Sequence, residues 1–285
     1  RPPGIQTQEV FLMGRPCPRC GSFGTRRYGR SRQGRQRWKC NDCGSTFSER
    51  TGTVFASMKL PPRKFELLVS LMLRDSTLET VSEVLGVSSK TAYLWRLKLF
   101  SCFAEFQKGS ILSGKVWVDE AFFALERKKW VLVNGDGRGP RNQIMVLCGV
   151  DSSGRRFAVS SGSGHLTKAK VMRIYGNRIK PGSFLVHDGI FPHRILVSSL
   201  GLGEEVAKST WPGSKRAMQP INSFIAEIKR SMYKHIGGRS EYIQIYMDWI
   251  VYKGTLNGMK MKDKIAKTLA FCIQSGVVFR TKDRY

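Results

Sequence analysis

The sequence has few acidic side chains and no long apolar run. Of its 285 residues, 21 are Asp or Glu and 48 are Lys or Arg, so the net charge is +27. The basic residues are spread along the whole chain, which favours a polyanionic partner over a merely solvated surface. No stretch approaches the ~20 apolar residues that a membrane span requires, so we expect no membrane partner.

The sequence also lacks a recognisable secretory signal, and it begins at Arg1 without a methionine, which leaves its native start open. Seven cysteines are present, and four of them form two Cys-x-x-Cys pairs. The other three, Cys102, Cys148 and Cys272, lie among apolar neighbours and are predicted to be small core residues. This usage favours a reducing compartment, the bacterial cytoplasm and nucleoid or a eukaryotic nucleus, over a disulfide framework.

The paired cysteines have the spacing of a zinc ribbon. They are Cys17, Cys20, Cys40 and Cys43. Each pair can sit on a tight turn that aims two thiolates at one point, and Gly21 and Gly44 follow where such turns need positive φ. Four cysteines leave no open coordination position, so the predicted Zn²⁺ is structural.

Between the cysteine pairs, residues 26–39 interleave arginines with Tyr28 and Trp38. This pattern predicts a β-hairpin that turns near Gln33 and Gly34. The arginines predicted to contact DNA are Arg26, Arg27, Arg30, Arg32, Arg35 and Arg37. Contact with phosphates or the minor groove is one interpretation, and a simply solvated hairpin is the other.

A helix-turn-helix is predicted after Pro61 and Pro62. Residues 63–74 have apolar positions at helical spacing, a second helix spans about 79–85, and Ser88 caps a third after Gly86. Ala92, Trp95 and Leu99 are expected to point inward. The exposed side of this recognition helix would carry Lys90, Thr91, Tyr93, Arg96 and Lys98, of which Lys90, Arg96 and Lys98 are predicted DNA contacts. An αα-hairpin that does not touch DNA is the alternative.

From about residue 112 the pattern becomes α/β. The expected strands are 116–119, 130–133, 143–150, 156–160, 183–187 and 204–208. Glycine-rich residues 134–141, including Asp136, are expected to form a loop, and 151–154 a turn. Helices are expected over about 167–179 and from about 220 to His235, stopping at Gly237 and Gly238. The order βββαβαβα is that of an RNase H-like core.

Two of the predicted buried strands lead to aspartates. Strands entering one sheet side by side could bring Asp119 and Asp188 to the same metal ion, and a late helix could add Asn222. Oxygen ligands of this kind suit Mg²⁺ or Mn²⁺ and metal-dependent phosphoryl transfer. Asn222 supplies only a neutral oxygen, so this set has one charge fewer than three carboxylates.

Neighbouring polar residues have competing interpretations. Lys229 is two helical turns from Asn222 and could hold a phosphate, or could be solvated. Glu227 is about 140° around the helix from Asn222, which makes it a weaker ligand candidate. Glu120 should face away from Asp119, either as a group that supports the site or as a surface residue without a role in it.

Asp151 is expected to be a turn residue. His187 is expected to be packed or hydrogen-bonded, and His165, His193 and His235 lack partners at metal spacing.

Three motifs together resemble the ISXO-like insertion-sequence transposases, relatives of the eukaryotic Merlin elements. They are Val-Asp-Glu at 118–120 with Asp-Gly at 188–189, Ile-Asn-Ser-x5-Lys at 221–229, and His-x-Gly-Gly-x-Ser-x-Tyr-Ile-Gln-x-Tyr-Met-x-Trp at 235–249. The resemblance implies that Asp119, Asp188 and Asn222 form the catalytic set with Lys229. It also implies that the zinc ribbon helps to grip terminal inverted repeats and that a homodimer pairs two element ends.

The resemblance assigns Tyr242, Gln244, Tyr246 and Trp249 to its C-terminal motif, and we expect them to pack a helix. The predicted domains are a zinc ribbon over 1–55, a helix-turn-helix over 56–110, a catalytic domain over 111–260 and a basic C-terminal segment over 261–285. The expected function is a Mg²⁺-dependent DNA transposase that cuts terminal inverted repeats and joins 3′ hydroxyls to target DNA. A catalytically inactive DNA-binding protein derived from a transposase and a nuclease without joining activity are the rival hypotheses.

Overall fold

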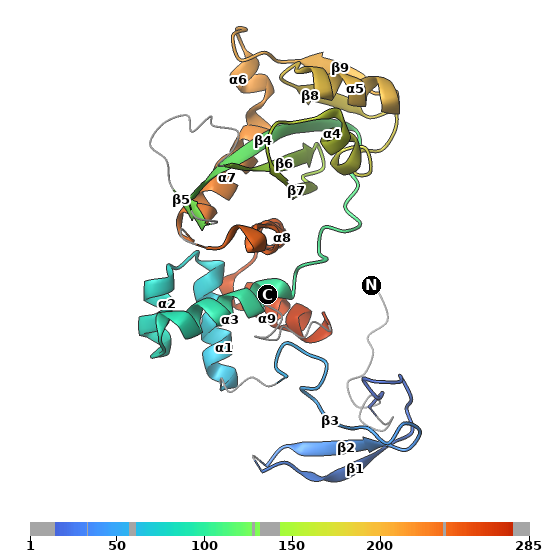
Figure 1. Ribbon diagram of the computed structural model, residues 1–285, viewed down its shortest axis with the longest axis vertical. Coiled ribbons are helices and arrows are strands. Elements are labelled where there is room, and N and C mark those ends of the chain that lie inside the picture. The colour runs from blue at the N-terminus through green and yellow to red at the C-terminus, as the bar shows by residue number, and fades with distance from the viewer. Residues whose placement is uncertain are drawn as a thin grey trace. The chain divides into compact units, whose positions relative to one another are not determined.

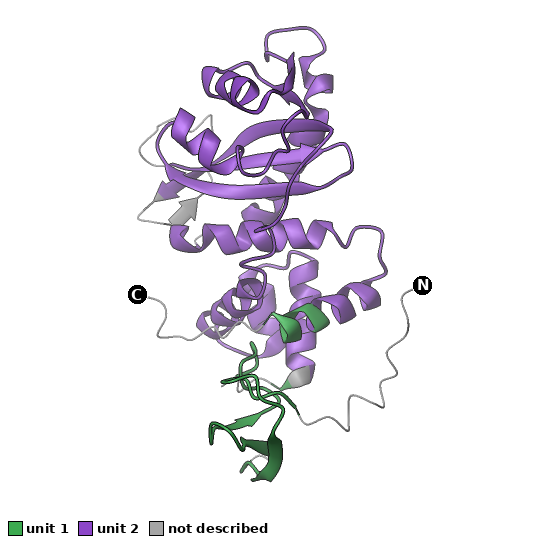
Figure 2. Ribbon diagram, turned by 90° about the vertical axis from the view of Figure 1, so that its right-hand side faces the viewer, with its two compact units in different colours: residues 1–61, 270–285 green, residues 62–269 purple. Residues whose placement is uncertain are grey.

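The computed structural model describes residues 15–32, 34–56, 61–126, 129–131, 143–235 and 238–275. It forms two compact units, residues 1–61 with 270–285 and residues 62–269 (Figure 2). The predicted helix-turn-helix and catalytic core therefore belong to one compact unit. The predicted domain boundaries stay predictions, and the expectations for Gln33, for residues 132–133 of the strand expected over 130–133, for all of 134–141 and for Gly237 lie outside the described residues.

The first unit contains a three-stranded antiparallel sheet of β1 (Thr25–Arg30), β2 (Gln36–Cys40) and β3 (Thr46–Ser48). The β1–β2 hairpin is the one expected from the sequence, with Thr25 opposite Cys40. The small core of this unit consists of Cys17, Cys40 and Phe47, with Trp38 and Cys43 packed against them.

The second unit opens with three helices, α1 (Pro62–Leu73), α2 (Leu78–Leu85) and α3 (Ser89–Ser101). The Thr77 side chain caps α2, and Gly86 ends it in the left-handed conformation at φ 60°. Ser88 caps α3 by accepting a hydrogen bond from the backbone N–H of Thr91. These contacts confirm the helix-turn-helix pattern with its break at Gly86 and its cap at Ser88, and they add the Thr77 cap, which the sequence patterns did not indicate.

A mixed sheet forms the centre of the second unit. Its strands are β4 (Lys115–Glu126), β5 (Lys129–Val131), β6 (Gln143–Asp151), β7 (Arg156–Ser163), β8 (Phe184–His187) and β9 (Gly203–Val206). Along the main path the order is β7-β6-β4-β8-β9, and β5 pairs with β4. Strands β7, β6 and β4 are antiparallel neighbours, whereas β8 and β9 add in parallel. This topology confirms the RNase H-like fold class.

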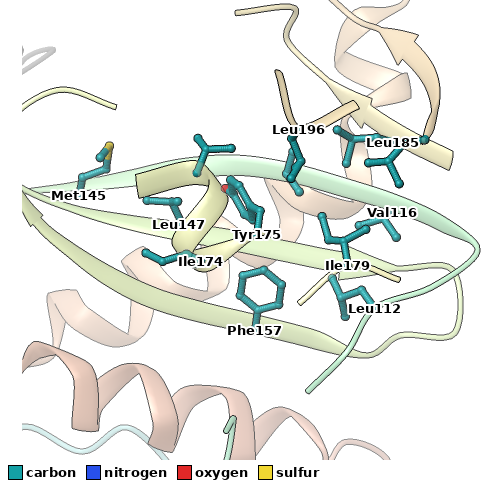
Figure 3. Close-up of a cluster of buried hydrophobic side chains, with 13 residues drawn as sticks. Leu112, Val116, Met145, Leu147, Phe157, Ile174, Tyr175, Ile179, Leu185 and Leu196 are labelled. Carbon is teal, nitrogen blue, oxygen red and sulfur yellow. The ribbon is translucent and has the colours of Figure 1, made fainter. Parts of the chain in front are cut away.

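Helices cover the sheet on both sides. The remaining described helices are α4 (Lys168–Ile174), α5 (Phe191–Leu200), α6 (Ser214–Ala217), α7 (Gln219–Tyr233), α8 (Ile243–Gly254) and α9 (Met261–Gln274), with a short 3-10 helix at Ser240–Tyr242. Residues of α4 and α5 share a buried apolar cluster with β4 and β6 (Figure 3). Helix α7 packs on the opposite side of these strands (Figure 1).

Helix α4 is shorter than the sequence indicates. It ends at Ile174 rather than near Ile179. The backbone of Ile179 instead forms a parallel bridge with Leu112, and Leu112 N–H donates to the Arg178 carbonyl at 2.7 Å. Pairing of this segment with residue 112 competes with continuation of the helix, and local periodicity does not reveal such a long-range contact.

The free edge of the sheet, at β7, is covered by two glutamines. Gln107 accepts a hydrogen bond from Ala158 N–H at 2.6 Å and donates to its carbonyl at 3.1 Å. Gln244 of α8 accepts from Ser160 N–H at 2.8 Å. These amides satisfy backbone groups that an additional strand would otherwise pair with, so the edge is not left open.

The three lone cysteines, Cys102, Cys148 and Cys272, are buried as expected. Among the described residues, no helix is long and apolar enough to span a membrane.

Candidate active site

Asp119 and Asp188 lie on neighbouring parallel strands. Trp117 of β4 pairs with Val186 of β8, and continuing this register by two residues places Asp119 opposite Asp188. Gly189, at φ 84°, follows Asp188, and a side chain there would meet Val206 of β9, since a Cβ atom would lie 2.6 Å from Val206 Cγ1. Glycine therefore lets the chain turn closely over the sheet after Asp188.

Each aspartate has one oxygen held by the protein. Asp119 Oδ1 accepts a hydrogen bond from Glu120 N–H at 2.8 Å. Asp188 Oδ1 accepts from Ile190 N–H and from His193 Nδ1, both at 3.2 Å. Within the described part of the chain, neither Oδ2 atom takes part in a hydrogen bond. Two carboxylate oxygens therefore remain available for a cation, which is the arrangement that hard divalent metals prefer.

The electrostatics of the two aspartates differ. Burial raises the pKa of Asp119 to about 6, and the charges of Glu120 and Asp188 add to this increase. Burial also opposes ionisation of Asp188, but the hydrogen bonds from His193 and Ile190 and the charge of His193 together outweigh burial and lower the pKa of Asp188. The ionised form of Asp119 is therefore disfavoured by burial and by repulsion from the neighbouring carboxylates, and a bound cation would stabilise it.

His193, which the sequence patterns do not single out, connects the two strands. Its Nε2 lies 3.0 Å from Glu120 Oε1 and its Nδ1 lies 3.2 Å from Asp188 Oδ1. Burial lowers the pKa of His193, but the two carboxylate contacts outweigh burial and raise it to about 9. Glu120 faces away from Asp119 as expected, but its side chain is buried and contacts His193, so it is not a surface residue without a role.

His187, Asp188 and His193 are close enough to suggest a second metal site. However, His187 Nδ1 accepts a hydrogen bond from Gly189 N–H, and its Nε2 lies 3.0 Å from Glu204 Oε1. Both ring nitrogens of His193 are also occupied, by Asp188 and Glu120. With every imidazole nitrogen engaged, this trio lacks free histidine ligands, and the expectation that His187 is hydrogen-bonded is confirmed.

Helix α7 brings its polar residues to the Asp119 side of the sheet. Trp117 shares that side of β4 with Asp119, and its Nε1 donates to the Ala217 carbonyl at 2.9 Å, just before α7 begins. Asn222 is in the first turns of α7 and is exposed. Lys229, further along the helix, is also exposed, and its charge acts on Cys148, which lies opposite Asp119 in the β4–β6 pair.

Two acidic alternatives have structural roles. Glu227 forms a bidentate ion pair with Arg156, with oxygen–nitrogen distances of 2.7 and 3.2 Å. Asp151 is buried in its turn, where it accepts hydrogen bonds from Ser113 N–H, Ser153 N–H and Arg155 N–H. The expectation that Asp151 is a turn residue is confirmed, and the ion pair leaves Glu227 a poor substitute for Asn222.

The four paired cysteines form a cluster in the first unit. All four sulfur atoms lie within 4.8 Å of one another, and Cys17–Cys43 and Cys20–Cys40 are each 3.6 Å apart. Zn–S bonds of ~2.3 Å in a tetrahedron put sulfur atoms about 3.8 Å apart, so the cluster fits Zn²⁺. Gly21 and Gly44 adopt the positive φ expected of the two turns.

The arginine-rich hairpin is solvent-facing. Arg26, Arg27, Arg30 and Arg32 are exposed, and Arg35 and Arg37 are half-buried. Tyr28 and Trp38 support this surface, because Arg37 lies 5.6 Å from the Tyr28 ring and Arg27 lies 6.0 Å from the Trp38 ring.

One predicted DNA contact on α3 is wrong. Arg96 is only 2% exposed and lies between the rings of Tyr93 and Tyr246, with its Nη1 3.1 Å from His235 Nδ1. Its face of α3 packs against α8. Lys90 is exposed and Lys98 is half-buried, so both stay candidates for contact with DNA.

The C-terminal motif residues confirm the expected packing role in part. Tyr246 and Trp249 are fully buried, and Phe100 of α3 stacks on Trp249 with ring centroids 4.8 Å apart. Gln244 contacts the β7 edge, and Tyr242 is half-buried.

One curated protein and two solved structures are similar to parts of this chain. An uncharacterized protein in transposable element ISH50 of Halobacterium salinarum is 37% identical over 78 residues, which span 27% of this chain and only 26% of that relative. The Mos1 strand transfer complex is 15% identical, with a TM-score of 0.28 over 78% of this chain and 82% of that chain. A simian T-cell lymphotropic virus intasome is 13% identical, with a TM-score of 0.30 over 56% and 48% of the two chains.

Both structural likenesses are low, and the RNase H-like fold follows from the strand order alone. The model of the ISXO2-like transposase domain matches residues 111–255, about half of the chain. This range includes both aspartates, Asn222 and Lys229. The chain belongs to the ISXO2-like transposase family.

Proposed function

We propose that this protein is a metal-dependent DNA transposase that cuts element ends at terminal inverted repeats and joins the 3′ hydroxyls to target DNA. The observation that carries the proposal is the pair of adjoining carboxylates, each with one oxygen held and one available. Family membership and the net charge of +27 support DNA as the substrate. A homodimer on paired ends is part of the same proposal.

In this proposal, Asp119, Asp188 and Asn222 would hold Mg²⁺ or Mn²⁺, which would supply activation of the attacking oxygen and neutralisation of charge on the leaving oxygen of a phosphodiester. Lys229 lies on the same helix as Asn222 and would hold a phosphate flanking the cleaved bond. The zinc ribbon, the exposed arginines of its hairpin and Lys90 with Lys98 would hold the DNA through its backbone.

The first test replaces the aspartates. Asp119→Ala and Asp188→Ala should each abolish cleavage of duplexes carrying the inverted repeats that flank the gene, while end binding is largely kept. Glu205→Gln is a matched control, because Glu205 is a half-buried acid of the same sheet that pairs with Lys115. Normal cleavage by either aspartate variant would refute the assignment. A natural chain that binds the ends without cutting them would support the inactive DNA-binding alternative.

The second test concerns the neutral third ligand. Asn222→Asp keeps an oxygen at this position and should retain some cleavage with a changed preference between Mg²⁺ and Mn²⁺, whereas Asn222→Ala should be inactive. Cleavage rates across a metal titration distinguish these outcomes. Full activity of Asn222→Ala would place the third ligand elsewhere.

A further inference from the structure

A series of buried hydrogen bonds links Asp188 to the strand that contains Asp119. The His193 side chain is fully buried at the start of α5 and contacts one carboxylate with each ring nitrogen, Glu120 at 3.0 Å and Asp188 at 3.2 Å. Carboxylate oxygens can only accept in these contacts when ionised, so the imidazole donates to both. The proposed transfer reaction assigns no role to either His193 or Glu120.

Tyr175 holds Glu120, at the other end of this series of hydrogen bonds. The Tyr175 hydroxyl lies 3.2 Å from Glu120 Oε1 and 3.1 Å from the Asp119 carbonyl oxygen. The Tyr175 ring also meets the His193 ring edge-on, with centroids 5.8 Å apart. Glu120 is therefore held from two sides, and its backbone N–H in turn holds Asp119 Oδ1.

Asp188 needs such support more than Asp119 does. Asp119 lies within a long strand, whereas Asp188 follows the last residue of β8 and its side chain is 37% exposed. A carboxylate on a loop loses rotamer freedom when it binds a metal, which weakens binding unless neighbouring groups have already ordered it. The contact from His193, together with Ile190 N–H, restrains Asp188 Oδ1 and leaves Oδ2 available.

We infer that His193, anchored by Glu120, is a positioning residue that holds the Asp188 carboxylate in its metal-binding orientation and at a set separation from Asp119. This inference rests on the proposed function, because it takes Asp188 to be a metal ligand. A buried histidine that only stabilises the fold would make the same contacts, so the test must separate positioning from stability.

Two amide substitutions separate these roles. In His193→Asn the amide nitrogen replaces Nδ1 and can still donate to Asp188. In His193→Gln it replaces Nε2 and can still donate to Glu120 but not to Asp188. Each variant loses one of the two contacts, so their thermal stabilities should fall by similar amounts. His165→Gln, at an exposed histidine, is the control.

The measurement is Mn²⁺ binding by isothermal titration calorimetry to the full chain whose cysteine cluster is first saturated with Zn²⁺. We expect His193→Gln to weaken Mn²⁺ binding by about 10–100-fold, as loss of a group that orients a metal ligand does. His193→Asn should stay within a few-fold of the natural chain. Equal Mn²⁺ affinity in both variants and the natural chain, or equal losses in both variants, would overturn the inference.

Cleavage assays on the same proteins separate this inference from the proposed function. If the natural chain binds Mn²⁺ through Asp188 and His193→Gln weakens binding, but no protein cuts DNA, the proposed function fails and the positioning role stands. If the natural chain cuts DNA and both variants keep its metal dependence, the positioning role fails and the proposed function stands.

Discussion

At the scale of single residues, burial decides what a polar side chain can do. Arg96 looks like a DNA contact when placed on a helical wheel, but it is buried against Tyr246 and His235. Glu227 looks like a spare ligand, but Arg156 takes both of its oxygens. Asn222 and Lys229 stay exposed. Of these four polar residues, Asn222 and Lys229 are therefore the two that keep polar groups available.

Asp248 gives a residue-scale prediction about pH. It is buried in α8, accepts a hydrogen bond from Gln107 at 2.7 Å, and its Oδ2 has no partner within the described part of the chain. Burial raises its pKa from 3.8 to about 7. Because the folded state holds this proton more tightly than the unfolded state, the stability that protonation contributes is lost as pH rises from about 4 to 7.

The amide of the Asp248→Asn variant cannot ionise, so this variant should not lose stability through ionisation at position 248 as the pH rises. Its free energy of unfolding relative to the natural chain should rise by about 2–4 kcal/mol between pH 4 and pH 7 and then level off. Urea unfolding at a series of pH values measures the difference. A pH-independent difference would mean that Asp248 titrates normally in the fold.

At the scale of elements, an ion pair joins α7 to the edge of the sheet beneath α8. Arg156 of β7 pairs with Glu227 of α7 and lies 4.8 Å from the ring of Phe224. Its guanidinium fills the space beside Gly254, where a Cβ atom would lie 1.1 Å from Nη2. The absence of a side chain at Gly254 therefore lets α7, α8 and β7 meet, and α7 carries Asn222 and Lys229.

Gly254→Ala should break this arrangement. Alanine normally favours a helix over glycine by about 1 kcal/mol, but here it must displace Arg156, so we expect a net loss of about 1–3 kcal/mol in unfolding free energy. Gly109→Ala, where nothing lies within 4 Å of an added Cβ, is the matched control. In an Arg156→Ala background the cost of Gly254→Ala should vanish, and an unchanged cost in that double-mutant cycle would contradict the steric explanation.

At the scale of the whole molecule, the two compact units depend on different interactions. The second unit has an extensive apolar cluster between its sheet and helices (Figure 3). The described core of the first unit is small, with Cys17, Cys40 and Phe47 at its centre. A core of that size cannot offset the chain entropy of folding, so the first unit should need its metal.

Removal of Zn²⁺ with a chelator should therefore unfold the first unit and leave the second folded. Hydrogen exchange should show loss of protection in β1–β3 with little change in β4, β6 and β8, and DNA affinity should fall. Cys20→Ser should reproduce the effect, whereas Cys102→Ala, at a buried cysteine outside the cluster, should bind Zn²⁺ normally. Retained protection of β1–β3 without metal would show that this sheet folds without it.

The sequence by itself determined the elements whose signals are local. Paired cysteines, the cap at Ser88, the turn at Asp151 and the alternation of buried strands all act over a few residues, so the zinc ribbon, the helix-turn-helix and the order of strands along the chain could be predicted. Adjacency of Asp119 and Asp188 was also expected, because strands that enter one sheet side by side bring their ends together, and β4 does pair with β8 although β5, β6 and β7 lie between them in the sequence.

Only the tertiary structure decided which polar groups meet across the fold. The contacts of His193 with Glu120 and Asp188, of Arg96 with His235 and of Arg156 with Glu227 join residues from different elements. The early end of α4 likewise depends on the Leu112–Ile179 bridge. No periodicity or spacing encodes such pairs, because they depend on how helices and strands pack in three dimensions and on which side chains that packing buries.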